Sequence, residues 1–532
     1  MITTTSWLGG HALVMPIVLP LVAGALLVLL EKARSRAAVP ISLLATGALL
    51  ILAARLMDQA NSGEVAVYLL GNWRAPFGIT LALDRLSALM LVLTALVAGG
   101  ALWFALGFSL KDEARQGQHF HSLFQFQLMG LCGAFLTADL FNLFVFFELL
   151  LAASYGLLLH GGTRARHRAA LHYVVFNLAG SALFLIAVSL LYGVAGTLNM
   201  ADLALKLPLL PPAQARLAQA AVLMLLVVFA VKAALLPLYF WLPDTYAAAS
   251  APVAALFAIM TKVGVYAIAR TSTLLLGPEG GPLAGVASPM LPVLALATLV
   301  LAATGALAAR HLRVLVAYAV VASAGTLLLA IGLGTRDALA AGLFYLVNST
   351  LVAALWFLLA DRIATARGGT DRLEARAFSR GWAPLGITFF AAAVAVAGVP
   401  PLAGFMGKAL LLQAAGHTPL AGWVVALVLG SSLAMMMALA RAGSTLFWKA
   451  GAATTAVVPP AGGSGAQGAS MLALLAAVLA TAAFAGPLAA YTQAAATQLM
   501  QRQAYIGAVL NAEPVPPAYD VRREMRERGD AK

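Results

Sequence analysis

Three lysines and one glutamate stand inside apolar stretches that are long enough to cross a lipid bilayer. A charged side chain at the centre of a membrane helix costs about 3 kcal/mol or more, and such residues mark ion and proton pathways. Lysine changes its protonation state readily when it is buried, whereas arginine stays charged. The candidate proton-carrying groups are therefore Glu148, Lys232, Lys262 and Lys408.

Two of these lysines lie beside residues that break helices. Proline in a helix interior removes a backbone hydrogen bond. Broken backbone at membrane depth is tolerated only where protein buries it or where it lines a wet cavity. The sequence therefore predicts two interrupted helices beside a water-lined path. The residues concerned are Pro237, Pro243 and Asp244 near Lys232, and Pro400 and Pro401 near Lys408.

Glu148 and Lys232 are natural partners. Glu148 is the only acidic residue that the sequence places well inside a span, where an uncompensated carboxylate would be costly. The two could form a static salt bridge that fixes helix packing, or a pair whose separation changes and drives the lysine proton on or off. Lys232 alone could also be a snorkelling lysine beside a structural kink. Lys262, on the next span, could share a hydrated line with Lys232.

Other polar residues could extend this path. His311 stands at a helix start in "ARHLRVLVAYAVVASAG", either as a loop histidine or as a proton carrier. Ser323 stands in the tenth apolar span, and Asn348, Ser349 and Thr350 stand in the eleventh. They could carry water or a cation, or could only bond one helix to another.

The composition is that of a membrane protein. The 532-residue chain is 62% hydrophobic and 10% charged, whereas soluble proteins carry about 25% charged residues. The net charge is +13, and the basic residues lie mostly in short loops between the apolar spans, where they orient the helices. This charge therefore does not indicate a nucleic-acid-binding protein. The single Cys132 excludes an internal disulfide and a cysteine-ligated metal centre. Without a phosphate-binding loop, nucleophile elbow or H-E-x-x-H motif, the sequence predicts a transporter rather than an enzyme, with no cofactor and no metal.

About fourteen spans of membrane length follow one another. Loops after odd-numbered spans are richer in Arg and Lys, which places them in the cytoplasm and the N-terminus outside. An even count also places the C-terminus outside, although the tail "VRREMRERGDAK" is basic. The spans are expected near 11–30, 37–57, 82–108, 122–138, 140–160, 168–193, 218–241, 247–274, 288–309, 313–334, 337–360, 380–414, 421–448 and 469–493.

The interrupted helices fall in the seventh and twelfth spans. Five spans apart, they run in opposite directions, as inverted-topology repeats require, and matched discontinuous helices mark transport sites. The predicted fold is an all-α polytopic membrane protein with two inverted five-helix repeats. Its parts are expected at 1–110 (helices 1–3), 111–275 (first repeat, helices 4–8), 276–450 (second repeat, helices 9–13) and 451–532 (a loop, helix 14 and a basic tail).

Four segments carry a family resemblance. They are "LFVFFELLLAASYGLLLHGG", "FAVKAALLPLYFWLPDTYAAASAPVAALFAIMTKVGVYAIAR", "RHLRVLVAYAVVASAG" and "GVPPLAGFMGKALLL". Together they resemble the antiporter-like subunits shared by multisubunit Mrp-type Na+/H+ antiporters and respiratory complex I. The resemblance covers residues 80–450 and implies fourteen helices, two inverted five-helix repeats, and function inside a complex of several different subunits.

The resemblance also implies roles for individual residues. Glu148 would pair with Lys232, Lys262 would continue a central polar axis, and Lys408 would end it in the second half. The chain departs from the pattern at two places. Relatives often carry a histidine near Asn348 and a lysine five residues later, and many carry an acidic residue where this chain has His311.

The sequence therefore predicts a proton-translocating core subunit of a multisubunit Na+ or K+/proton antiporter. It would be a multi-pass protein of a bacterial inner membrane, with other membrane subunits and lipid as partners. The alternative is a proton-pumping membrane subunit of a complex I-like or hydrogenase redox complex. A third reading is a structural assembly subunit that conducts nothing.

Overall fold

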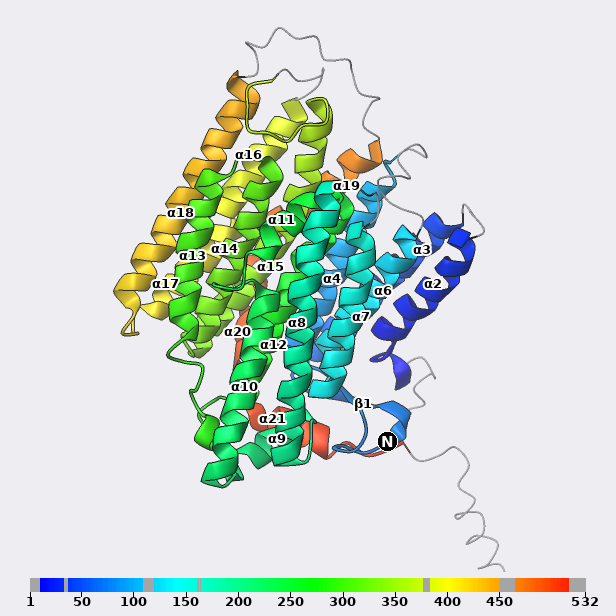
Figure 1. Cartoon of the computed structure of the whole chain (residues 1–532), viewed down its shortest axis with the longest axis vertical. Coiled ribbons are helices and arrows are strands. Elements are labelled where there is room, and N and C mark those ends of the chain that lie inside the picture. Colours follow the sequence, from blue (N-terminus) through cyan, green and yellow to red (C-terminus); the bar gives the residue numbers. More distant parts are fainter. Residues whose placement is uncertain are drawn as a thin grey trace, which may run out of the picture.

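The computed structural model describes residues 10–32, 37–108, 119–159, 162, 164–376, 383–449 and 465–515. In these ranges the chain forms a bundle of long helices that run side by side (Figure 1). Helices α2 (Met15–Lys32) and α3 (Ala38–Asn61) lie at one edge, and α18 (Ala421–Gly443) lies at the other. Eleven of the described helices are long and apolar enough to cross a membrane. The polytopic helical architecture is thus confirmed.

Most helices begin and end within a few residues of the expected spans. The basic tail after residue 515 and the loop at 450–464 lie outside the described residues. The other long helices are α4 (Arg85–Ala105), α6 (Phe120–Leu136), α7 (Leu140–Leu159), α8 (Arg164–Ala195), α10 (Pro212–Ala233), α12 (Ala251–Leu274), α13 (Leu291–Ala308), α14 (Leu312–Gly332), α15 (Arg336–Ala366), α16 (Ala383–Ala397), α17 (Ala403–Ala415), α19 (Gly465–Ala483) and α20 (Ala485–Met500).

The structure adds a small sheet to the predicted all-α fold. Strands β1 (Ala66–Leu69) and β2 (Thr80–Leu83) pair antiparallel, with Ala66 opposite Leu83. They lie at the same end of the bundle as the short helices α9 (Met200–Lys206) and α21 (Arg502–Leu510) (Figure 1). The strands were not predicted from the sequence because they are short and stand between much longer apolar runs.

Local capping explains several helix starts. The Asp84 carboxylate accepts a hydrogen bond from the Ser87 backbone N–H at 2.9 Å at the start of α4. Asp139 accepts one from the Asn142 backbone N–H at 2.9 Å before α7. Such bonds satisfy backbone donors that have no partner inside the helix.

Both interrupted helices lie where the prolines predict them. Helix α10 ends at Ala233, and the short α11 (Trp241–Ala248) begins only after a non-helical stretch. The Trp241 indole N–H donates to the Val231 carbonyl at 3.0 Å, which satisfies one of the last carbonyls of α10. Helix α16 likewise ends before α17 begins, so the stretches expected as single spans at 218–241 and 380–414 are each broken.

Helices α12 and α15 form the centre of the bundle. Their apolar stretches are wholly buried by protein, whereas only about a third of the corresponding stretch of α3, α8 or α18 is buried. The peripheral helices therefore turn much of their surface outward, as lipid-facing helices do. The centre is consequently the place where polar side chains at membrane depth find partners.

Candidate functional site

Lys232 lies in the last turn of α10 and is 7% exposed. Its ammonium nitrogen donates a 2.7 Å hydrogen bond to the Asn177 side-chain carbonyl on α8. The same nitrogen lies 5.8 Å from the centre of the Phe147 ring, within the range of a cation–π contact. An uncharged amide therefore holds this lysine.

Glu148 on α7 is held separately. Its carboxylate accepts a hydrogen bond from the Ser181 hydroxyl, again on α8. Asn177 and Ser181 are four residues apart, so they lie on the same face of that helix. In the described part of the chain no ion pair joins Glu148 to Lys232. Instead, neighbouring turns of α8 hold the two members of the expected pair.

Lys262 lies in the middle of the central helix α12 and is fully buried. Its ammonium donates to the Ser323 hydroxyl on α14 at 2.9 Å. A side chain at Gly264 would meet the Ala233 backbone nitrogen at 2.5 Å, so α12 packs directly against the end of α10. This close approach brings the helices of Lys232 and Lys262 together.

A small cavity continues from Ser323 toward the second half of the chain. Its volume is about 20 Å³, and its wall includes Ser323, Asn348 and Val396. The Asn348 amide oxygen is buried and has no hydrogen-bond partner among the described residues. The wall is mainly apolar, but Ser323, Asn348 and Ser349 give it polar groups, and the volume is large enough for about one water molecule. Ser349 also lines it, whereas Thr350 bonds back to its own helix through the Leu346 carbonyl at 2.7 Å.

Lys408 lies on α17, next to the end of the broken helix α16. Its ammonium donates to the Ser432 hydroxyl at 2.9 Å and to the Ala397 carbonyl at 3.2 Å. The Val396 carbonyl, at 3.5 Å, completes the set. Uncharged oxygen atoms thus accept the hydrogen bonds of all three lysines, Lys232, Lys262 and Lys408.

His311 stands apart from this line. It occupies the N-cap position of α14, and its Nδ1 lies 2.9 Å from the Asp371 carboxylate. Ser323 is twelve residues further along the same helix, which corresponds to about 18 Å at the usual helical rise. Asp244 lies in the first turn of α11, where a carboxylate favours the helix N-terminus.

A buried ion pair was not predicted from the sequence. The Arg270 guanidinium donates to Asp84 at 2.5 Å, and the two residues are only 4% and 2% exposed. Ser87 and Tyr266 contribute further polar contacts to the guanidinium. Arg270 lies near the end of an apolar span, so its sequence position resembles that of an ordinary flanking arginine.

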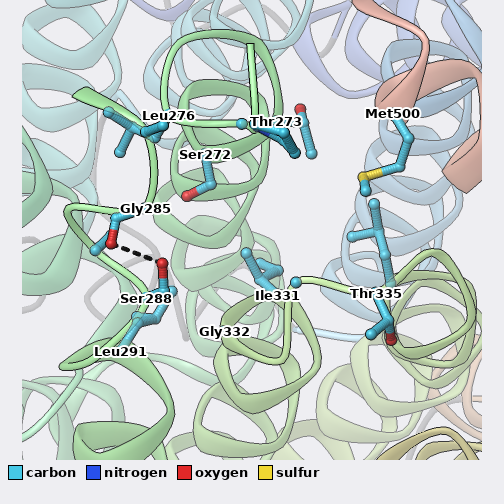
Figure 2. Close-up of a pocket in the computed structure, with 16 residues that line it drawn as sticks. Ser272, Thr273, Leu276, Gly285, Ser288, Leu291, Ile331, Gly332, Thr335 and Met500 are labelled. Atoms are coloured by element: carbon cyan, nitrogen blue, oxygen red, sulfur yellow. Dashed lines mark hydrogen bonds between the residues drawn. The ribbon is translucent and has the colours of Figure 1, made fainter. Parts of the chain in front are cut away.

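Two larger cavities lie at the end of the bundle where α14 stops and α15 starts. One, of about 420 Å³, includes Ser272, Thr335 and Met500 in its wall (Figure 2). The other, of about 450 Å³, is lined by Asp337 and His417 among others. None of the residues predicted from the sequence lines either cavity.

Comparisons with known proteins identify the family to which this chain belongs. Residues 137–437 match the family model described as NADH:quinone oxidoreductase/Mrp antiporter, TM. The D subunit of a probable K(+)/H(+) antiporter from Rhizobium meliloti (strain 1021) is 42% identical over 96% of this chain and 99% of its own length. The Na(+)/H(+) antiporter D subunit of Alkalihalophilus pseudofirmus is 37% identical over 76% of this chain and 81% of its own.

Superposition on solved structures supports the same family assignment. A chain in the Mrp complex from Dietzia sp. DQ12-45-1b superposes with a TM-score of 0.83 at 27% identity, covering 95% of this chain and 100% of that one. A chain of respiratory complex I from Thermus thermophilus superposes with a TM-score of 0.76 at 27% identity, covering 92% and 99%. The chain belongs to the NADH:quinone oxidoreductase/Mrp antiporter family of membrane proteins. Within that family it resembles the D subunits of Mrp-type antiporters, and it is a multi-pass protein of the bacterial plasma membrane.

Proposed function

We propose that this chain is a proton-translocating core subunit of a multisubunit monovalent cation/proton antiporter. Its curated relatives bear the names of K+/H+ and Na+/H+ antiporter D subunits. A matching chain comes from a whole Mrp complex, so the partners we propose are other membrane subunits of a hetero-oligomer. Inward movement of protons would drive the export of Na+ or K+.

The observation that carries this proposal is the bonding of the lysines. Lys232, Lys262 and Lys408 each donate to uncharged oxygens, and none of them forms an ion pair within the described residues. A lysine in a salt bridge leaves a stranded carboxylate when it loses its proton, which is costly in a membrane interior. A lysine held by an amide or hydroxyl leaves a neutral hydrogen-bond acceptor behind, and the Glu148 carboxylate acts on Lys232 only through space, without a direct ion pair among the described residues. These lysines can therefore pass protons on.

The route we propose follows the order of these contacts. Glu148 and Lys232 would exchange protons in the first half, and Lys262 would carry the charge to Ser323. The cavity beside Asn348 would bridge the gap to Lys408. His311, paired with Asp371, would act at the other end of α14 as a proton acceptor.

The finer architecture is part of the same proposal. The eleven long helices, together with three shorter apolar helices at Met15–Glu31, Phe120–Leu136 and Ala383–Ala397, correspond to fourteen crossings. The broken pairs α10/α11 and α16/α17 would then be matching members of two inverted five-helix repeats. The domain boundaries expected from the sequence, with repeats at 111–275 and 276–450, follow from this arrangement.

The experiment uses the assembled complex in inside-out vesicles from a host that lacks its own antiporters. Dissipation of a proton gradient is measured when Na+ or K+ is added. We expect Lys232→Ala to abolish the response while the complex still assembles. Normal antiport by that variant would refute the role of Lys232.

The alternative is the same fold as a pumping subunit of a redox complex. It is favoured by the superposition on a complex I chain. Purification of the native complex distinguishes the two functions, because a redox complex would copurify with flavin or iron–sulfur subunits and would reduce an electron acceptor.

A further inference from the structure

The oxygens around Lys408 form a small cradle at the end of a broken helix. We call the Val396 carbonyl, the Ala397 carbonyl and the Ser432 hydroxyl the α16 cradle. The first two belong to the last turn of α16, where carbonyls lack partners inside the helix and carry partial negative charge. In this structure the Lys408 ammonium occupies the cradle, with contacts of 3.5, 3.2 and 2.9 Å.

The backbone is shaped to admit this ammonium. Gly398, directly after α16, has a φ of 76°, a conformation that other residues rarely adopt. A Cβ at this position would lie 3.1 Å from the Lys408 nitrogen and 3.0 Å from its Cδ. Because glycine has no side chain, the lysine can lie across the end of the helix. The cradle is therefore a fitted site for one positive charge.

A second polar group lies close to the cradle. The cavity of about 20 Å³ described above is lined by Val396 of the cradle and by Asn348. Asn348 is 1% exposed, and its amide oxygen has no hydrogen-bond partner within the described ranges. The cavity can hold about one water molecule. An Asn348 oxygen that is unpaired among the described residues therefore lies on the same small cavity as the cradle residue Val396.

Resting on the function proposed above, we propose that the α16 cradle is a binding site for a monovalent alkali-metal cation that competes with the Lys408 ammonium. Carbonyls at the ends of broken membrane helices coordinate Na+ in transporters, and carbonyl oxygens replace the hydration shell of K+ in channels. The cradle consists of two such carbonyls and one hydroxyl, all of them neutral oxygens. An ion and an ammonium cannot share it, because they use the same oxygens and repel each other. The site therefore holds either the lysine charge or the transported ion.

The test measures equilibrium binding of 22Na+ and 86Rb+, the latter in place of K+, to the purified complex. Lys408→Ala removes the competing charge and opens its space. We expect it to bind one of the two ions at least about tenfold more tightly than the wild-type complex. Lys408→Met is the matched control because it fills the same space without charge, and it should bind clearly less than Lys408→Ala. Equal binding by the wild type and Lys408→Ala overturns the proposal.

A second variant keeps the test decisive if Lys408→Ala does not assemble. Ser432→Ala removes one cradle oxygen. It should raise the cation concentration for half-maximal antiport about two- to tenfold, the usual effect of one hydrogen bond. Ser431→Ala is the control, because among the described residues the Ser431 hydroxyl bonds only to its own helix, at the Val428 carbonyl. An unchanged half-maximal concentration in Ser432→Ala overturns the cradle as the cation site.

The two proposals fail in different ways. A wild-type complex that catalyses antiport, but whose Lys408→Ala variant binds no additional ion, refutes the cradle and leaves the antiporter function intact. A wild-type complex without antiport refutes the function, whereas the binding measurement still reports on the cradle.

Discussion

Asn177 offers the sharpest test of how Lys232 takes part in proton transfer. Its amide oxygen accepts a 2.7 Å hydrogen bond from Lys232, and its own amide N–H donates to the Tyr173 carbonyl at 2.7 Å. The change Asn177→Leu preserves the approximate volume but removes the acceptor of the lysine. Lys232 is 7% exposed, so water cannot readily replace the lost partner.

The expected size of the effect follows from this contact. A hydrogen bond to a charged group contributes about 1.5–3 kcal/mol, and each 1.4 kcal/mol corresponds to a tenfold change in an equilibrium. The charged form of Lys232 should therefore become roughly ten- to a hundredfold less populated. If that form is an obligatory intermediate, antiport should slow by a similar factor.

The assay is antiport in inside-out vesicles with matched amounts of assembled complex. Ser189→Ala is the control on the same helix, because in the part of the chain that the structure describes the exposed Ser189 hydroxyl bonds only to its own helix, at the Leu185 carbonyl. Asn177→Gln, which restores an amide, should recover part of the rate. Antiport at the wild-type rate in Asn177→Leu would refute the reasoning, since the amide would then contribute nothing to the lysine charge.

Three further predictions concern other contacts. Asp84→Asn should destabilise the complex by about 3–5 kcal/mol, because it leaves the Arg270 charge buried and unpaired; a thermal unfolding midpoint equal to the wild type would contradict this. Gly264→Val should disrupt the packing of α12 on α10, where even a Cβ would lie 2.5 Å from backbone, and normal antiport by this variant would show that the helices separate easily. Hydrogen bonds from Arg502 hold the pKa of the exposed Glu279 carboxyl below its usual value of 4.5. The ionised Glu279 carboxylate stabilises the contact with Arg502, and this contribution is lost as the pH falls through the lowered pKa. Docking of α21 should therefore weaken at low pH, as measured by faster hydrogen exchange in that helix. Glu279→Gln should show no such pH dependence.

Much of the fold could be predicted from the sequence because its causes are local. An apolar run must form a helix in lipid, since every backbone polar group needs a partner within the segment. The prolines at 237 and 400 mark real interruptions for the same reason, because each removes a backbone donor. The small strands at Ala66–Leu69 and Thr80–Leu83 escaped prediction, since four residues carry too little pattern to compete with the long spans around them.

The residues of the candidate site were predictable as charges but not as contacts. Lys232, Lys262 and Lys408 stand out because a charge in an apolar run is costly. Their acceptors do not stand out, because a serine or asparagine in a membrane helix can equally bond to its own backbone, as Thr350 does. Nothing in the one-dimensional pattern separates Ser323 from such residues.

By itself, the sequence determined a polytopic helical membrane protein with two broken helices and lysines within its spans. These properties depend on hydrophobicity and on backbone hydrogen bonding over a few residues. The tertiary structure alone decided that Asn177 holds Lys232 across 55 residues of sequence and that Ser323 holds Lys262 across 61. Such pairings depend on which helix faces meet in the bundle, and packing around the buried α12 and α15 sets those faces.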